Sequence, residues 1–198
     1  EFSMSEYNGD LRIATTDWQW NGQQGGNHLF VLRPFGRDLR TIGALRGLAR
    51  GERIYAGRMI GDTGYLVTFR QTDPLFTLDL RDPAHPRVAG ELQLNGFSNY
   101  IHPIGGDQLL TIGQDADAGG RPLGLQVQLF DVSDPEHPTR RFKQKVAANS
   151  PYAYSAAAYD PHAFTWDAVT GTLALPVTEA SHNGLALFHV DPRRRIRR

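Results

Sequence analysis

Short β-prone runs of apolar residues alternate with turns rich in Gly, Asp and Pro along the whole chain. The run FTLDL leads into residues 82–86 (DPAHP), and the run LFDV leads into residues 134–138 (DPEHP). We call these two segments the Asp-Pro turns. The runs LFVLRPF and ALFHVDP match the same strand nearer the two termini. The four runs recur about every 50 residues, and a fixed period of this size indicates a repeat architecture.

Turn signals divide each repeat into four predicted strands, which we call a to d in chain order. Units of roughly 40 to 50 residues with four strands are typical of β-propeller blades. The strands alternate less cleanly than those of a surface sheet, as expected where neighbouring blades cover both faces. The sequence therefore predicts an all-β fold, a β-propeller segment of about four four-stranded antiparallel blades. The single propeller, residues 1–192, divides into blades at approximately 1–46, 47–95, 96–147 and 148–192.

The end of the chain departs from the repeat. The last blade is expected to be incomplete, because HVDPRRRIRR runs into arginines where strand d should begin. Residues 193–198 are therefore predicted to form a basic, disordered tail. The one segment with helical character is YSAAAYD, residues 154–160, and it is short.

Composition narrows the classes of partner. Lys plus Arg and Asp plus Glu each number 21 among the 198 residues, so the net charge favours neither nucleic acid nor a membrane surface. No apolar run approaches the roughly 20 residues that span a bilayer. There is no cysteine, which excludes disulfides, thiolate metal sites and cysteine nucleophiles. The chain opens in mid-pattern, as expected for a piece of a longer parent.

The Asp-Pro turns combine an acid with a histidine, but their pattern favours architecture. An Asp carboxylate accepts hydrogen bonds from backbone N–H groups two residues on, and Pro presets φ for the next position. Two ligands such as Asp82 and His85 do not complete a metal site. In an up-and-down blade these turns and the Gly-containing a–b turns share one end of the sheets. We predict that they are structural.

The b–c and d–a connections at the other end vary in length, and such loops on a rigid scaffold commonly carry binding. Trp18 and Trp20 stand beside amides there, which suits carbohydrate or peptide contacts, although an indole packed on a neighbouring blade is the alternative. Arg70 and Asp73 are interpreted as an ion pair between blades or within the loop. The loop TEASHNG adds His182 as a ligand-binding candidate.

Two further groups of residues carry weaker hypotheses. Asp115 and Asp117 occupy alternate positions, as in calcium loops, but Gly119 replaces the third ligand and no Glu closes the loop. No other cofactor is indicated. Histidines and tyrosines on or near strand a are candidates to converge on the propeller axis, or else to fix blade packing; they are Tyr100, His102, Tyr154 and His162.

Motifs of hydrolytic and phosphate-binding enzymes do not occur: there is no G-x-S-x-G elbow, no H-E-x-x-H and no phosphate-binding glycine loop with its lysine. A set of short segments runs through the sequence: VTFRQTDPLF, the DPxxP turns, GEL followed by GFSxYxHP, LFDVSDPxxP and HAF. Together these segments resemble the C-terminal β-propeller domain of a family of secreted bacterial and archaeal proteins. This resemblance implies a propeller fold and an extracytoplasmic location, and it carries over no catalytic residue.

We therefore predict a non-enzymatic binding module of a secreted or surface protein, with its ligand face built from the b–c and d–a loops. The expected ligand is a protein or a glycan. The alternative is a propeller hydrolase that acts on glycans through carboxylates at the channel mouth. A third interpretation is a segment whose open sheet edges pair with the remainder of a larger propeller or with another copy.

Overall fold

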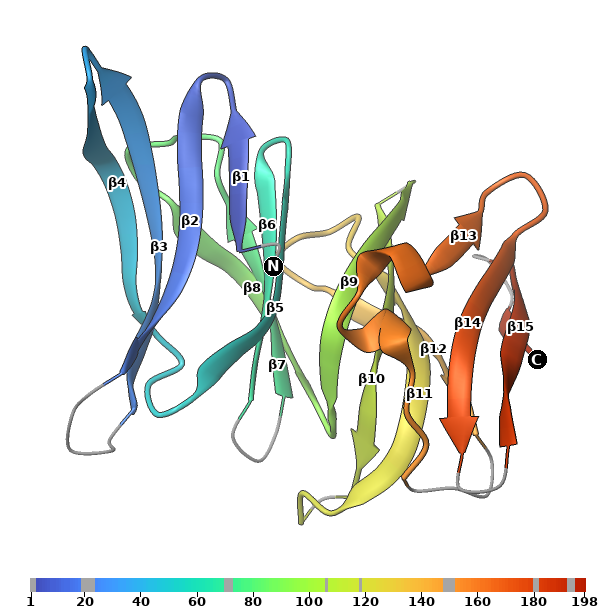
Figure 1. Ribbon diagram of the computed structural model, residues 1–198. Coiled ribbons are helices and arrows are strands. Elements are labelled where there is room, and N and C mark those ends of the chain that lie inside the picture. Colours follow the sequence, from blue (N-terminus) through green and yellow to red (C-terminus); the bar gives the residue numbers. More distant parts are fainter. Residues whose placement is uncertain are drawn as a thin grey trace.

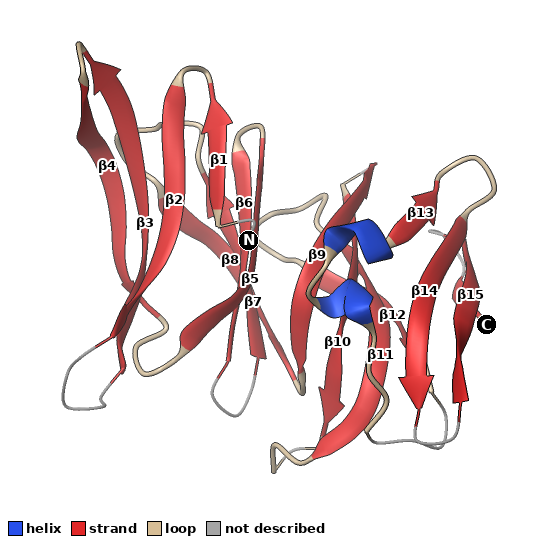
Figure 2. Ribbon diagram, viewed as in Figure 1, coloured by secondary structure: helices blue, strands red, loops and turns tan. Residues whose placement is uncertain are grey.

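The computed structural model describes residues 3–18, 24–69, 73–105, 107–117, 119–147, 152–179, 182–191 and 195–198. In this part of the chain, the strands form four antiparallel sheets of four strands each, and hydrogen-bonded neighbours follow chain order in every sheet. Figure 2 shows that strand dominates and that helix is confined to one short segment. The prediction of an all-β chain with four-stranded blades is confirmed.

The strands of the four sheets have the following bounds. The first sheet contains β1 (Met4–Tyr7), β2 (Asp10–Trp18), β3 (Gln24–Phe35) and β4 (Asp38–Leu48). The second contains β5 (Arg53–Ile60), β6 (Thr63–Phe69), β7 (Asp73–Asp79) and β8 (Arg87–Leu94). The third contains β9 (Phe97–Gly105), β10 (Gln108–Ala116), β11 (Pro122–Asp131) and β12 (Thr139–Lys145). The fourth contains β13 (Thr165–Asp167), β14 (Thr172–Glu179), β15 (His182–Asp191) and β16 (Arg195–Arg197).

The C-terminal stretch corrects one prediction. Residues 195–197 were expected to belong to a disordered tail, but they form β16, which pairs with β15 and gives the last sheet its fourth strand. Ile196 lies opposite Val190 and is buried, while Arg197 is exposed. One apolar side chain between arginines thus provides the period-two alternation that a half-buried strand needs. The run of arginines concealed this pattern.

The fourth sheet also begins differently from the others. Two single-turn 3-10 helices, η1 (Ala156–Ala158) and η2 (Pro161–Ala163), precede the short β13. The predicted helical character of 154–160 is thus confirmed as one 3-10 turn. Tyr154 nevertheless pairs with Thr178 of β14 through two backbone hydrogen bonds of 2.9 and 2.8 Å. The innermost strand of this sheet is therefore interrupted by the helical segment.

The sheets pack face to face in chain order, and the first and last lie at opposite sides of the molecule (Figure 1). A separate apolar cluster fills each junction: Leu29 and Leu66 belong to the first, Val67 and Phe130 to the second, Leu129 and Phe188 to the third. Strands β10 and β11 are buried on both faces along most of their length. Burial on both faces explains why the middle strands read as nearly continuous apolar runs.

The Asp-Pro turns connect the third and fourth strands of the second and third sheets, as predicted. In the first turn, Asp82 accepts a hydrogen bond from the Ala84 N–H at 2.9 Å, and its other oxygen lies 2.8 Å from His85 Nδ1. The second turn repeats these contacts around Asp134 at 3.0 and 2.9 Å. The acid and the histidine of each turn therefore satisfy one another and the backbone within the turn.

Each Asp-Pro turn also rests on a glycine of the preceding sheet. A Cβ atom on Gly90 of β8 would lie 2.5 Å from the carbonyl oxygen of Glu136, and Gly43 of β4 faces the first turn equally closely. Thr77 of β7 also donates a hydrogen bond to the carbonyl of Pro135 across the junction. The turns are thus docking elements between sheets, and only glycine leaves room for their backbone.

Candidate binding groove

The inner strands β5 and β9 and the η1 segment border a hollow at the end of the sheets that carries the b–c and d–a connections. Its volume is about 460 Å³. An adjoining hollow of about 130 Å³ extends it along the same strands. We call the two together the inner groove; the larger hollow is lined by Arg53, Ile54, Tyr55, Phe97, Asn99, Ala158 and Tyr159. We call this end of the sheets the groove end and the opposite one the turn end.

Aromatic rings form one side of the inner groove. Tyr55 and Phe97 lie 4.8 Å apart between ring centroids, and Phe69 packs against both at 5.5 and 4.7 Å. The Arg53 guanidinium lies over the Tyr55 ring at 4.4 Å and donates a hydrogen bond of 2.9 Å to its hydroxyl. Aromatic rings with a polar tip and an arginine are the side chains most enriched at the energetic centres of protein interfaces.

The η1 segment forms another side of the groove. Tyr159 lines the hollow, and Tyr154 stacks on it with centroids 5.9 Å apart. Tyr159 is 64% exposed and Tyr154 49%, so both rings present much of their area to solvent. Ser155 fixes the turn between them by accepting a hydrogen bond from the Ala157 N–H at 3.2 Å. The hydrogen-bonded turn thus places two largely uncovered aromatic rings beside the groove.

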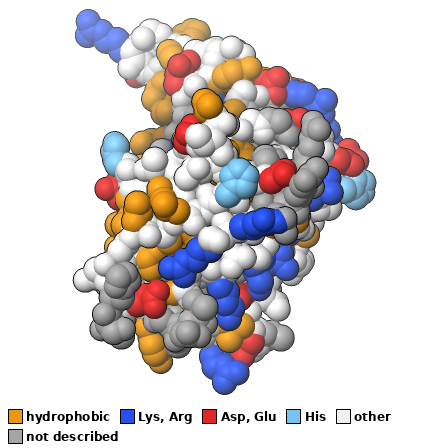
Figure 3. All heavy atoms as spheres, turned by 90° about the vertical axis from the view of Figure 1, so that its right-hand side faces the viewer, with side chains coloured by type: hydrophobic (Ala, Val, Ile, Leu, Met, Phe, Trp, Pro, Cys, Tyr) orange, Lys and Arg blue, Asp and Glu red, His pale blue; other side chains and the backbone are white. Residues whose placement is uncertain are grey.

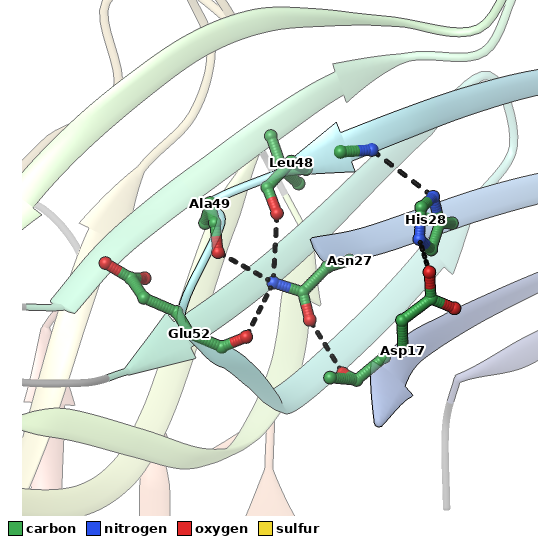
Figure 4. A network of polar contacts seen from close by, with 8 residues as sticks. Asp17, Asn27, His28, Leu48, Ala49 and Glu52 are labelled. Carbon is green, nitrogen blue, oxygen red and sulfur yellow. Dashed lines mark hydrogen bonds and ion pairs between the residues drawn. The ribbon is translucent and has the colours of Figure 1, made fainter. Parts of the chain in front are cut away.

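A buried asparagine fixes the chain that enters the groove, as Figure 4 shows. The Asn27 side-chain nitrogen lies 3.1, 3.3 and 3.2 Å from the carbonyl oxygens of Leu48, Ala49 and Glu52, so its two N–H groups are shared among three acceptors. Its oxygen accepts a hydrogen bond of 2.6 Å from the Thr16 hydroxyl. Ala49 has a φ of 45°, a left-handed conformation that an alanine rarely adopts. These bonds hold the connection into β5, whose first residues line the inner groove.

The side chains predicted to converge on the axis separate into three places. Tyr100 and His102 meet, with the hydroxyl 3.2 Å from Nδ1, and His102 stacks on Phe164 at 4.9 Å. Burial and the nearby Arg58 guanidinium lower the pKa of His102, and burial raises the pKa of Tyr100. This pair packs between the third sheet and the segment that precedes β13, which agrees with the packing alternative.

The other two do not join that pair. Tyr154 stacks on Tyr159, as described above. His162 is exposed and lies 2.9 Å from the carboxylate of Asp160. The predicted ligand contact of His162 stays a prediction.

Several predicted binding residues fall on the groove end without described side chains. Trp18 ends β2, Asp73 begins β7 and His182 begins β15, so their backbone lies at the predicted end of the sheets. Trp20 and Arg70 lie outside the described residues. The predicted ligand contacts of these five residues stay predictions.

The two acids of the calcium hypothesis face cationic partners. Asp115 is buried and lies 2.8 Å from Lys143 Nζ. Asp117 accepts hydrogen bonds from the backbone N–H groups of Gly119 and Arg121 at 3.0 and 2.9 Å, and the Arg121 side chain lies 3.0 Å away. Within the described ranges, no three acids or histidines gather as metal ligands. These contacts support an ion-paired loop in preference to a calcium site.

The turn end carries a second hollow, of about 300 Å³, between the second and third sheets. It includes Asp79, whose carboxylate lies 2.6 Å from Arg81 and 2.7 Å from Arg87. The hydrogen bond from Arg81 is the main reason why the pKa of Asp79 lies well below its ordinary value. Both arginines on this hollow are thus already engaged by an internal carboxylate, which makes it a poorer site than the inner groove.

The inner groove lies at the end of the sheets where the sequence predicts the ligand face, but the residues that form the groove were not predicted as a group. Tyr55, Phe97 and Tyr159 belong to three different units, and no local motif joins them. Aromatic residues at or near the start of strand a were the signal in the sequence that could have identified the groove.

No helix in the described ranges has the length and apolar character to cross a membrane.

Comparisons with known proteins agree with this architecture. A family model described as a beta propeller domain matches residues 1–198. An uncharacterized protein of Methanocaldococcus jannaschii is 40% identical over 192 residues, and one of Archaeoglobus fulgidus is 39% identical over 191. Each match covers 96% of this chain but only 28% and 27% of these archaeal proteins. The chain thus spans little more than a quarter of the length of the curated relatives that it matches.

Solved structures show the same fold. Sqt1 from Chaetomium thermophilum superposes with a TM-score of 0.60 at 13% identity, covering 96% of this chain and 42% of that one. Sqt1 bound to the N-terminus of the ribosomal protein L10 gives a TM-score of 0.57 at 14% identity, with 93% and 43% covered. At such identities the likeness concerns architecture alone.

Proposed function

The chain belongs to the beta propeller domain family, and we propose that it is a non-enzymatic module that binds an extended polypeptide segment in the inner groove. The observation that carries the proposal is the set of partly uncovered rings of Tyr55, Phe97 and Tyr159 around one hollow, beside Arg53. Such rings bury a large apolar area at low entropic cost when a ligand covers them.

A peptide ligand also suits the shape and chemistry of the groove. The inner strands β5 and β9 are the edge strands of their sheets, so they present backbone donors and acceptors as well as side chains. Asn99 adds an amide beside the rings. A structural neighbour of the same fold, Sqt1, binds the N-terminus of a ribosomal protein, which supports a polypeptide ligand by analogy.

The hydrolase alternative needs a pair of carboxylates at the site. The residues described as lining the inner groove include neither Asp nor Glu. This composition favours binding over glycoside hydrolysis. The extracytoplasmic location stays a prediction of the family resemblance.

The test is selection of random peptides displayed on phage against the 198-residue chain, followed by titration of the selected peptides. Replacing Tyr55 or Tyr159 by Ala is expected to weaken binding about tenfold, the typical effect of removing an aromatic anchor. Val169, 95% exposed at the turn end, supplies the control Val169→Ala, which should bind normally.

Unchanged affinity in both tyrosine variants would refute the groove as the binding site. A glycan array run on the same variants tests the carbohydrate alternative. Glycan binding that Tyr55→Ala abolishes, without any selected peptide, would replace the polypeptide by a sugar ligand.

A further inference from the structure

Arg12 of β2 is a buried arginine, with only 4% of its surface exposed. Arginine side chains ordinarily lie at the surface, like the lysine and arginine side chains coloured blue in Figure 3. A buried guanidinium is costly unless its charge and its hydrogen-bond donors find partners. The contacts of Arg12 therefore show how far the chain itself meets this cost.

The partners of Arg12 within the chain are neutral. Its Nε donates a hydrogen bond of 2.9 Å to the Ser5 hydroxyl, and its Nη1 donates one of 2.5 Å to the carbonyl of Gly61. The guanidinium also lies over the Tyr7 ring, 4.9 Å from the centroid. The two hydrogen bonds use two of the five N–H donors of a guanidinium. Among the described residues, no carboxylate lies within ion-pair distance of Arg12.

The corresponding positions of the next two sheets are neutral. Arg12 is the third residue after the turn between the first two strands of its sheet, and Tyr65 and Leu110 are the third residues after the equivalent turns. Tyr65 is 7% exposed, and Leu110 is fully buried. A junction between sheets is therefore filled without a charge at this position. The positive charge of Arg12 calls for a reason other than packing.

A hollow of about 40 Å³ lies beside Arg12, between the first and second sheets at the turn end. The β1–β2 and β5–β6 turns, which Arg12 joins through Gly61, lie side by side at the top of Figure 1. Asn8 and Arg81 also line the hollow, and both are exposed, so it reaches the surface. A water needs roughly 10–15 Å³ of such space, so the hollow has room for a carboxylate or phosphate group.

Two acids border the same hollow, and they differ in what they contact. Both oxygens of Asp10 accept hydrogen bonds of 2.7 Å from Arg33, so its charge is compensated there. Asp62 attracts Arg12 from beyond ion-pair distance. Burial nevertheless lowers the pKa of Arg12 from its ordinary value, so this attraction does not offset the loss of water. Asp62 is thus a competitor of any anion that enters the hollow.

We infer that this hollow binds a small oxyanion, a carboxylate or a phosphate group, through the N–H groups of Arg12 that Ser5 and Gly61 leave unused. The planar guanidinium matches the oxygen spacing of both groups, and such charge-assisted hydrogen bonds are roughly twice as strong as neutral ones. The Asn8 amide at the rim adds further donors. The site lies at the opposite end of the sheets from the inner groove, and the inference is independent of what that groove binds.

The experiment is a titration of the ¹⁵N-labelled 198-residue chain with sodium phosphate and, separately, with sodium acetate, at pH 7 and constant ionic strength. Backbone amide resonances of Asn8 and Gly61 report binding in NMR spectra. We expect saturable shifts with a Kd in the millimolar range, which is typical of one small charged group. Arg12→Leu introduces the residue type found at the corresponding position of the third sheet and should abolish the saturable shifts. The exposed Arg37→Leu removes the same charge elsewhere and should bind like the parent chain.

A second variant tests the site without disturbing Arg12. Asp62→Asn removes the competing charge and should tighten binding at least about threefold, since like charges near a site weaken anion binding. Phenyl phosphate, titrated beside inorganic phosphate, separates a phosphate group carried on a larger molecule from the free ion. Preference for phosphate, its ester or acetate identifies the source, and each of these results supports the site.

Three results would overturn the inference. The first is the lack of any saturable shift with all three anions. The second is equal binding by the parent chain and a folded Arg12→Leu variant, because the anion would then bind elsewhere. The third is an unchanged affinity in Asp62→Asn, which would separate the bound anion from this hollow even if Arg12→Leu failed to fold.

Discussion

The turn end and the groove end of the same four sheets satisfy their side chains in opposite ways. At the turn end, carboxylates bind partners within the chain: Asp79 holds two arginines, and Asp131 holds Ser133 and Arg141. At the groove end, the rings of Tyr55 and Tyr159 border an open hollow. Polar groups that already have hydrogen-bond partners within the chain contribute little to the binding of a ligand. Burying exposed aromatic surface under a ligand is favourable, because it removes apolar area from water.

This difference teaches that a motif of acid and histidine is a poor guide to function when its side chains already bind one another within the turn. The acid and histidine of each Asp-Pro turn meet one another, and the turn itself rests on a glycine of the neighbouring sheet. We therefore expect substitutions at the turn end to change stability and leave binding intact. At the groove end, replacing the exposed Tyr159 should change binding and leave stability nearly intact.

The strongest test of the turn end is Gly90→Ala. A Cβ atom at this position would lie 2.5 Å from the Glu136 carbonyl oxygen, and the obstruction is backbone, which cannot rotate away. We expect the free energy of unfolding to fall by about 3 kcal/mol, the upper part of the range for overpacking. Urea denaturation measures this change. Gly119→Ala, where the nearest atom is a side-chain oxygen at 3.3 Å, is the control and should have a small effect.

If Gly90→Ala were as stable as the control, the turns would not be docking elements. At protein concentrations and temperatures where the variant is folded, its affinity for a groove peptide should equal that of the parent chain. A loss of affinity there would show that the two ends are coupled.

The second test concerns the polar network of the groove end. Asn27→Ala removes the amide that binds the carbonyls of Leu48, Ala49 and Glu52, and these lose this partner in a partly buried region. We expect the free energy of unfolding to fall by about 2 kcal/mol. Thermal or urea unfolding measures it, with the exposed Asn183→Ala as the matched control. Equal stability of the two variants would contradict a fixing role for Asn27.

The smallest expected effect is the pH dependence contributed by Asp131. Hydrogen bonds from the Ser133 hydroxyl and backbone N–H, and then from Arg141, lower its pKa from 3.8 to about 2. Because the folded pKa lies below the unfolded one, the stabilisation is complete above about pH 4 and is lost as the pH falls toward 2. Asp131→Asn should cost about 1 kcal/mol at neutral pH, after allowance for partial exposure.

The measurement is the free energy of unfolding from pH 7 to pH 2. Its slope between pH 4 and pH 2 should be shallower in Asp131→Asn than in the parent chain. The exposed Asp38→Asn is the matched control for the change from Asp to Asn. An identical slope for Asp131→Asn would show that this carboxylate does not stabilise the fold.

Much of the architecture could be read from local signals. The Asp-Pro turns marked the repeat because an Asp binds backbone groups only two residues away, which makes the turn a property of its own sequence. The last strand escaped prediction because a single apolar residue, Ile196, carries its buried side among arginines. The interrupted start of the fourth sheet, around η1, was visible only as a short alanine run.

By itself, the sequence determined the all-β class, the four-strand period, the turns and the end of the sheets that carries the variable loops. Each of these depends on neighbours in the chain. Only the tertiary structure decided which glycines receive the Asp-Pro turns and which rings form the inner groove. The physical reason is that Tyr55, Phe97 and Tyr159 belong to three different units and meet only through the stacking of the sheets.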